Sequence, residues 1–165
     1  MRFEIVEIPE LSGPACKIYS IAFDGSEDTL FDCFLDNLED SFPAEVGEIW
    51  YKLEYMGREG GARIQFFRED EGRPGDGVVA LLKETGFSLR LYCIRYGSCT
   101  LLLGNGGYKS PSTRAWQDDQ HLTECVNELM TISSLITERI KNREIKLAPD
   151  GKLDGNLVFE IESEG

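Results

Sequence analysis

The chain of 165 residues contains a single histidine, His121, and its five cysteines include no CxxC pair. Zinc sites usually combine several Cys or His ligands at short spacing, so these counts exclude the common zinc patterns and predict no metal and no cofactor. We also expect no Ser–His or Cys–His catalytic centre, and we expect His121 to be a surface residue at the start of a helix. The cysteines are expected to be small buried hydrophobes in a reducing compartment.

Long apolar runs are also missing. No run approaches the roughly 18 residues that a membrane helix needs. The N-terminus has no signal-peptide apolar region, and residues 2–8 instead alternate polar and apolar side chains as a strand does. We therefore expect a cytoplasmic protein without membrane contact. Hydrophobic residues make up 41% of the chain, which is enough for one domain with a core.

Basic residues are scarce, since 17 Lys and Arg face 30 Asp and Glu, for a net charge of −13. This balance argues against nonspecific binding of nucleic acid. The charge is uneven, however: −10 over residues 1–60, +3 over residues 61–116 and −6 over residues 117–165. The basic middle indicates an anion-binding surface, although arginines on a sheet face often only pair with helix carboxylates.

Hydrophobic periodicity predicts an α+β domain with the order strand–strand–helix–helix–strand–strand–strand–helix plus a tail. The expected strands cover residues 2–8, 16–23, 78–82, 89–95 and 100–103. The expected helices start near Ser26, Ala44 and Asp118, and the last runs to about Lys141. We expect a small, twisted, mainly antiparallel sheet with the helices packed mainly on one face. Residues 1–143 would form one domain, and residues 144–165 a C-terminal tail or an edge strand.

A glycine-rich run, Gly104–Lys109, follows the last predicted strand and is expected to be a loop. It matches neither the phosphate-binding loop of nucleoside triphosphatases, GxxxxGK(S/T), nor the GxGxxG motif of dinucleotide-binding domains. Its backbone N–H groups could still converge on an anion, with Lys109 and Arg114 adding charge. A flexible turn between strand and helix is an equal alternative.

Arginines and a tyrosine mark the strand before this run. Strict alternation places Arg90, Tyr92 and Ile94 on one face and Arg95 on the other. Arg90 beside Tyr92 could position a phosphodiester, because the planar guanidinium donates two hydrogen bonds and stays charged. Arg63 lies upstream in the same basic segment, where pairing with acidic neighbours is the alternative role.

The segment from Leu89 to Lys109 resembles the core of RelE/HigB-type toxins. The resemblance rests on the strand Arg90-Leu91-Tyr92, the hairpin turn at Tyr96-Gly97-Ser98, the apolar strand at residues 100–103 and the glycine run that ends at Lys109. The order of elements agrees over residues 2–141. The strand at residues 78–82 lacks the lysines that members often carry, and Ser110 stands where many have a second lysine.

The resemblance implies a ribosome-dependent mRNA endoribonuclease that inhibits translation and is held inactive by a helix-turn-helix antitoxin protein. Arg90 and Lys109 match the basic positions of that family and are the expected catalytic residues, close together on a concave surface open to solvent. The expected substrate-binding residues are Arg63, Tyr92, Arg95, Gly106, Gly107 and Arg114. Two alternatives stay open, a catalytically silent protein-binding module of the same fold and a small-anion-binding domain.

Overall fold

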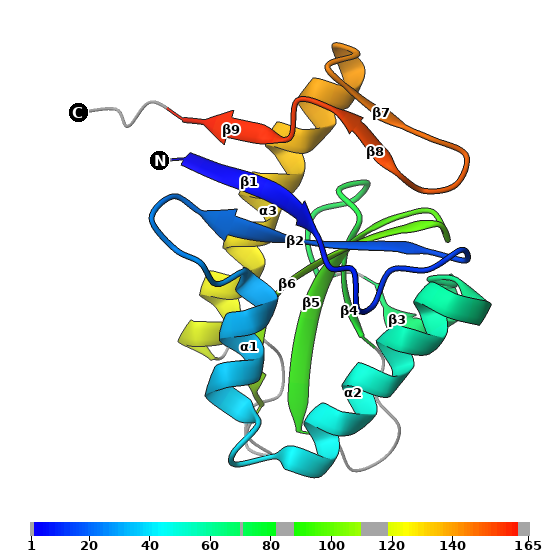
Figure 1. Ribbon diagram of the computed structural model, residues 1–165. Coiled ribbons are helices and arrows are strands. Elements are labelled where there is room, and N and C mark those ends of the chain that lie inside the picture. The colour runs from blue at the N-terminus through cyan, green and yellow to red at the C-terminus, as the bar shows by residue number, and fades with distance from the viewer. Residues whose placement is uncertain (1, 70, 82–87, 110–118, 162–165) are drawn as a thin grey trace.

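The computed structural model describes residues 2–69, 71–81, 88–109 and 119–161. Seven strands form one sheet in the order β3-β4-β5-β6-β2-β1-β9 (Figure 1). β2 and β6 run parallel, and the other neighbouring pairs in this sheet are antiparallel. The strands are β1 (Arg2–Glu7), β2 (Lys17–Phe23), β3 (Phe67–Arg68), β4 (Val78–Leu81), β5 (Leu89–Tyr96), β6 (Thr100–Tyr108) and β9 (Val158–Glu160). The predicted α+β class and largely antiparallel sheet are confirmed.

The α-helices begin where the sequence offers caps. In α1 (Leu30–Leu38), Thr29 accepts a hydrogen bond from the Asp32 amide, and the Asp32 carboxylate accepts one from the Thr29 amide. In α2 (Pro43–Tyr55), proline occupies the first position, where no amide hydrogen is needed. In α3 (Gln120–Lys141), Asp119 accepts from the Leu122 amide. Two short helical turns, η1 (Met56–Gly60) and η2 (Ile64–Phe66), lead from α2 into β3.

The helices cover both faces of the sheet, so the prediction that they pack mainly on one face was wrong. α1 and α2 bury one core, which includes Leu91 and Cys93 of β5. α3 lies on the opposite face and buries a second core, which includes Tyr92 and Ile94. The reason lies in the sequence of β5. Its odd-numbered and its even-numbered positions both carry apolar side chains, which indicates a strand that is covered on both faces.

The glycine-rich run is part of a strand, so the predicted loop was also wrong. β6 continues to Tyr108 and pairs with β5 as far as Leu89. The glycines are needed because neighbouring groups come close: a Cβ at Gly104 would meet the Leu129 side chain, and one at Gly107 would meet His121. A Cβ at Gly106 would overlap the carbonyl oxygen of Arg90. Glycine here permits close approach of α3 and β5 rather than flexibility.

The C-terminal segment adds further strands. β7 (Ile145–Leu147) and β8 (Leu153–Gly155) form a separate two-stranded sheet, and β9 pairs with β1 at the edge of the main sheet. Phe159 of β9 stacks on Phe3 of β1, with ring centroids 4.6 Å apart. The Arg139 guanidinium of α3 lies over the Phe159 ring, 3.6 Å from its centroid. These contacts join the segment to the core on the α3 face.

Two glycine-to-alanine substitutions test this account of β6. Gly106→Ala should lower the free energy of unfolding by about 2–3 kcal/mol, because the new methyl group overlaps backbone. Gly47→Ala, inside α2 with nothing within 4 Å of the added Cβ, should raise it by about 0.5–1 kcal/mol. Urea denaturation measures both, and equal effects of the two substitutions would contradict the packing argument.

Candidate functional site

Arg90 lies on the α3 face of β5, near the end of the strand at which the β5–β6 pairing stops. It is half-buried and lies opposite Gly107 of β6. Lys109 follows two residues after Gly107, and its amide donates to the Ser88 carbonyl oxygen at 2.6 Å. The register therefore puts the backbones of the two predicted catalytic residues on adjoining chain segments. That their side chains share one concave surface stays a prediction.

A second arginine, Arg68, shares this face. The pairing of β3 with β4 sets Arg68 opposite Ala80, and the pairing of β4 with β5 sets Ala80 opposite Tyr92. Side chains that are directly opposite on neighbouring strands point to the same side of a sheet. The small Ala80 thus separates Arg68 from the β5 residues. Sequence reading missed Arg68 as a site residue because its two-residue strand lies in a segment that reads as a charged loop.

The two arginines interact electrostatically. The pKa of Arg90 is lowered, first by burial and next by the positive charge of Arg68. The carboxylate of Glu71 opposes both effects, and it lies 3.5 Å from the Arg68 Nε. Glu71 is itself buried, at 3% exposure. A bound anion would stabilise the charged form of Arg90, which burial and Arg68 disfavour.

Tyr92 lies beneath this surface rather than on it, so it is not placed to contact a substrate as predicted. Its side chain is fully buried, and among the described residues its hydroxyl has no hydrogen-bond partner. Burial raises its pKa, with a further contribution from Glu71. Buried hydroxyl groups usually have a hydrogen-bond partner, so the Tyr92 hydroxyl is an exception, two residues from Arg90 on the same face of β5.

Of the other predicted substrate-binding residues, Gly106 and Gly107 lie beside Arg90, whereas Arg63 and Arg95 do not. Arg95 lies five residues along β5, roughly 17 Å away at the rise of a strand. Its Nε donates to the Ala62 carbonyl oxygen at 2.6 Å and its Nη2 to the Ser98 hydroxyl at 3.2 Å, on the opposite face as predicted. Arg63 is exposed and donates to the Gly60 carbonyl oxygen. Gly106 and Gly107 are inside β6, and Arg114 lies outside the described residues.

The structure brings a cysteine next to the histidine, contrary to the expectation from sequence. Cys125 Sγ is 3.7 Å from His121 Nε2, one turn apart on α3. That nitrogen also lies 2.9 Å from the Gly106 carbonyl oxygen, which can only accept a hydrogen bond. Nε2 must therefore carry the proton and is not a base for the thiol. Burial raises the pKa of Cys125 to about 12, which also keeps the thiol neutral.

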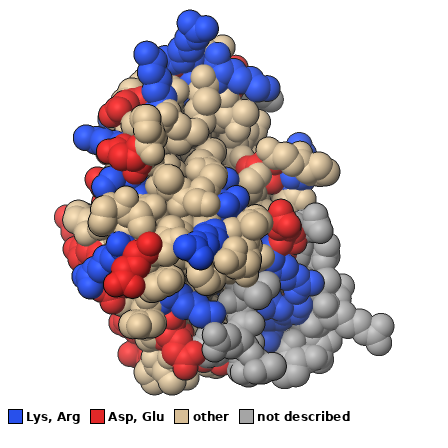
Figure 2. Space-filling model, turned by 90° about the vertical axis from the view of Figure 1, so that its right-hand side faces the viewer, with Lys and Arg blue, Asp and Glu red and all other residues tan. Residues whose placement is uncertain are grey.

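Basic and acidic side chains are interspersed on the side of the molecule shown in Figure 2. Lys and Arg side chains there occur in separate groups, with Asp and Glu side chains between them. An anion site in this protein therefore depends on a few placed arginines, of which Arg68 and Arg90 share a face, and not on a general positive field.

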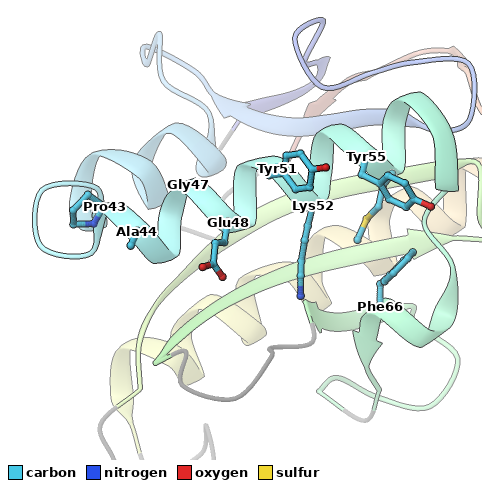
Figure 3. Close-up of a pocket in the computed structure, with 9 residues that line it drawn as sticks. Pro43, Ala44, Gly47, Glu48, Tyr51, Lys52, Tyr55 and Phe66 are labelled. Atoms are coloured by element: carbon cyan, nitrogen blue, oxygen red, sulfur yellow. The ribbon is translucent and has the colours of Figure 1, made fainter.

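A groove of about 650 Å³ runs along α2 on its side away from the core, and we call it the α2 groove. Figure 3 shows Tyr51, Lys52 and Tyr55 projecting from the helix and Phe66 facing them from η2. The groove is lined by Pro43, Ala44, Gly47, Glu48, Tyr51, Lys52, Tyr55, Met56 and Phe66. Tyr51 is 71% exposed and Tyr55 40% exposed, which is unusual for large aromatic side chains.

Within the described part of the chain, no group of three or more His, Cys, Asp or Glu side chains could hold a metal ion. No described helix is both long and apolar enough to cross a membrane. No protein-family model matches the chain, and neither a curated protein nor a solved structure is significantly similar to it. Any functional assignment therefore rests on the residues themselves.

The unpartnered hydroxyl of Tyr92 gives a direct test of the core below Arg90. Tyr92→Phe should raise the free energy of unfolding by roughly 1 kcal/mol, because it removes a buried polar group that has no partner. Tyr19→Phe is the matched control. Its hydroxyl accepts from the Leu153 amide at 2.9 Å, so its loss should destabilise by about 1 kcal/mol. Thermal and urea unfolding measure the change in the free energy of unfolding of both variants. Destabilisation by Tyr92→Phe would reveal a hydrogen-bond partner for the Tyr92 hydroxyl.

Proposed function

We propose that this protein is a RelE/HigB-like toxin that cleaves mRNA on the ribosome, with Arg90 as the residue that contacts the scissile phosphate. The observation that carries the proposal is the half-buried Arg90, its pKa lowered, next to Arg68 on one face of the sheet. Ionisable groups with shifted pKa values cluster at functional sites, which supports a binding role for Arg90.

The chemistry fits a site without a metal or a histidine base. The ribose 2′-hydroxyl loses its proton to water as its oxygen attacks the adjacent phosphorus, the bond to the 5′-oxygen breaks, and that oxygen takes up a proton from water, which leaves a 2′,3′-cyclic phosphate and a 5′-hydroxyl end. Negative charge builds on the phosphate oxygens in the transition state. A guanidinium can donate two hydrogen bonds to those oxygens, and Arg90 and Lys109 are the groups proposed to stabilise them. Arg68 joins them as a further phosphate ligand.

The net charge of −13 sets a condition on this function. An acidic protein gains little from long-range attraction to RNA and would depend on a partner, here the ribosome, to bring the RNA to it. Affinity for free RNA should therefore be low even if cleavage on the ribosome is efficient.

The second candidate is a protein-binding module of the same fold without catalysis, whose partner could be a helix-turn-helix antitoxin. The α2 groove with its exposed tyrosines favours it, since such patches mark protein contacts. The third candidate is a small-anion site built from a glycine-rich loop. No such loop supports it, because the glycines belong to the strand β6.

Expression of the chain alone in a bacterial host tests the first candidate. The wild-type protein should arrest growth and translation, and Arg90→Ala should relieve the arrest. Removal of one preorganised donor at a transition-state oxyanion costs about a hundred- to thousandfold in rate. Cleavage by purified protein on ribosomes with a bound mRNA, with mapped 5′ ends, measures the same loss directly.

Arg63→Ala is the matched control, because Arg63 is exposed and lies away from Arg90, next to the β5–β6 turn. It should keep full activity, and circular dichroism should show both variants folded. Growth that continues with wild-type protein at confirmed expression would exclude the toxin and leave the binding module. Arrest that is unchanged by Arg90→Ala would place the activity elsewhere.

A further inference from the structure

The α2 groove is built as a strip along one helix face. Ala44, Gly47, Glu48, Tyr51 and Tyr55 follow at helical spacing, so they line one side of α2. At one end the strip carries small side chains, and a Cβ added at Gly47 would have nothing within 4 Å. At the other end it carries aromatic rings, where Tyr55 meets Phe66 edge to face with centroids 6.3 Å apart. The strip thus offers close approach at one end and a large apolar contact at the other.

The dimensions of the strip correspond to a helix. α2 has 13 residues and is therefore about 20 Å long at 1.5 Å per residue. A partner helix of three to four turns would lie along it, with its backbone close to Gly47 and its apolar side chains between Tyr51 and Phe66. Helices bind in this way when apolar residues recur at three- and four-residue spacing.

The charge of the helical layer that carries the groove favours a basic partner. Residues 26–60, which form α1, α2 and their connections, carry ten acidic and two basic side chains, a net charge of −8. Glu48 and Lys52 both line the groove and Glu54 is engaged by Arg58 at 3.2 Å, so the acidic excess comes from the rest of the helical layer. Complementary charge speeds encounter and selects among partners of equal shape.

We propose that the α2 groove binds a basic amphipathic α-helix of a partner protein. The proposal deepens the second candidate function, the binding of a partner protein, and does not depend on RNA cleavage. The apolar side of the partner helix contacts Tyr51, Tyr55 and Phe66, and its lysines or arginines flank Glu48.

A synthetic peptide of 18 residues serves as the probe, with leucines at three- and four-residue spacing, one tryptophan and lysines at the remaining positions. Its affinity for the full chain is measured by calorimetry. Gly47→Gln should weaken binding at least tenfold, because it fills the close-approach end without altering charge, at a position where an added Cβ has nothing within 4 Å. Tyr51→Ala should weaken binding by a similar factor, since its ring is 71% exposed and contributes little to the fold.

Matched controls lie on α3, on the other side of the sheet. Ser134→Gln and Glu138→Lys alter exposed positions there and should leave the affinity within twofold, whereas Glu48→Lys should weaken it several-fold. If Glu48→Lys and Glu138→Lys weaken peptide binding equally, the peptide is attracted only by the net charge of the protein, and the proposed site is overturned. Tighter binding of the same peptide with glutamates in place of lysines would overturn the choice of partner.

Two further results are informative. Sedimentation of the wild-type chain as a dimer that Gly47→Gln dissociates would assign the groove to a second copy and overturn the proposal. The ribosomal cleavage assay uses Arg90 and not the groove, so failure of either proposal is seen separately. Full cleavage by Gly47→Gln, together with lost peptide binding, is the outcome that both proposals predict.

Discussion

The close contact between α3 and β6 is the constraint on which the rest of the structure depends. Gly104 and Gly107 leave room for Leu129 and His121, so the helix lies directly against the strand. Contact at this distance buries Val126, Leu129 and Ile136 and gives the sheet its second covered face. It also decides what β5 exposes: Tyr92 and Ile94 are buried, and Arg90, near the end of the pairing with β6, remains half-exposed. A larger residue at either glycine would move the helix and the arginine together.

Much of the fold could be read from the sequence because its signals are local. Apolar spacing located α1, α2 and α3, and alternation placed Arg90 and Arg95 on opposite faces of β5. The predicted start of the first helix near Ser26 was wrong, because Thr29 caps α1, which begins at Leu30. The other errors arose where a tertiary contact reverses a local preference. Glycine usually ends a strand, but in β6 it is selected by the approach of α3 and β5. In β5, apolar residues occupy both odd- and even-numbered positions, and this pattern in the sequence indicates a strand with two covered faces.

The candidate site was harder to predict, for a related reason. A single strand position shows which residues share a face, but not which strand lies beside it. Arg68 becomes a neighbour of the β5 residues only through two successive pairings, across Ala80. Arg63 and Arg95, which looked equivalent to Arg90 in a count of basic residues, instead bond backbone carbonyl groups near η1 and the β5–β6 turn. Likewise, the exposed side of α2 appeared in the sequence only as the polar side of an amphipathic helix.

The sheet separates the acidic helical layer of α1 and α2 from the pair Arg68 and Arg90. The helical layer of residues 26–60 carries a net charge of −8 on one face, and Arg68 and Arg90 lie on the other. The α2 groove and the two arginines therefore lie on opposite sides of the sheet. The arginine side is not uniformly basic, since residues 117–165 carry a net charge of −6 and the Glu71 carboxylate lies 3.5 Å from the Arg68 Nε. An anion site at Arg90 thus depends on two placed arginines and not on the charge of the whole face, and a basic partner helix on α2 would not compete with a phosphate there.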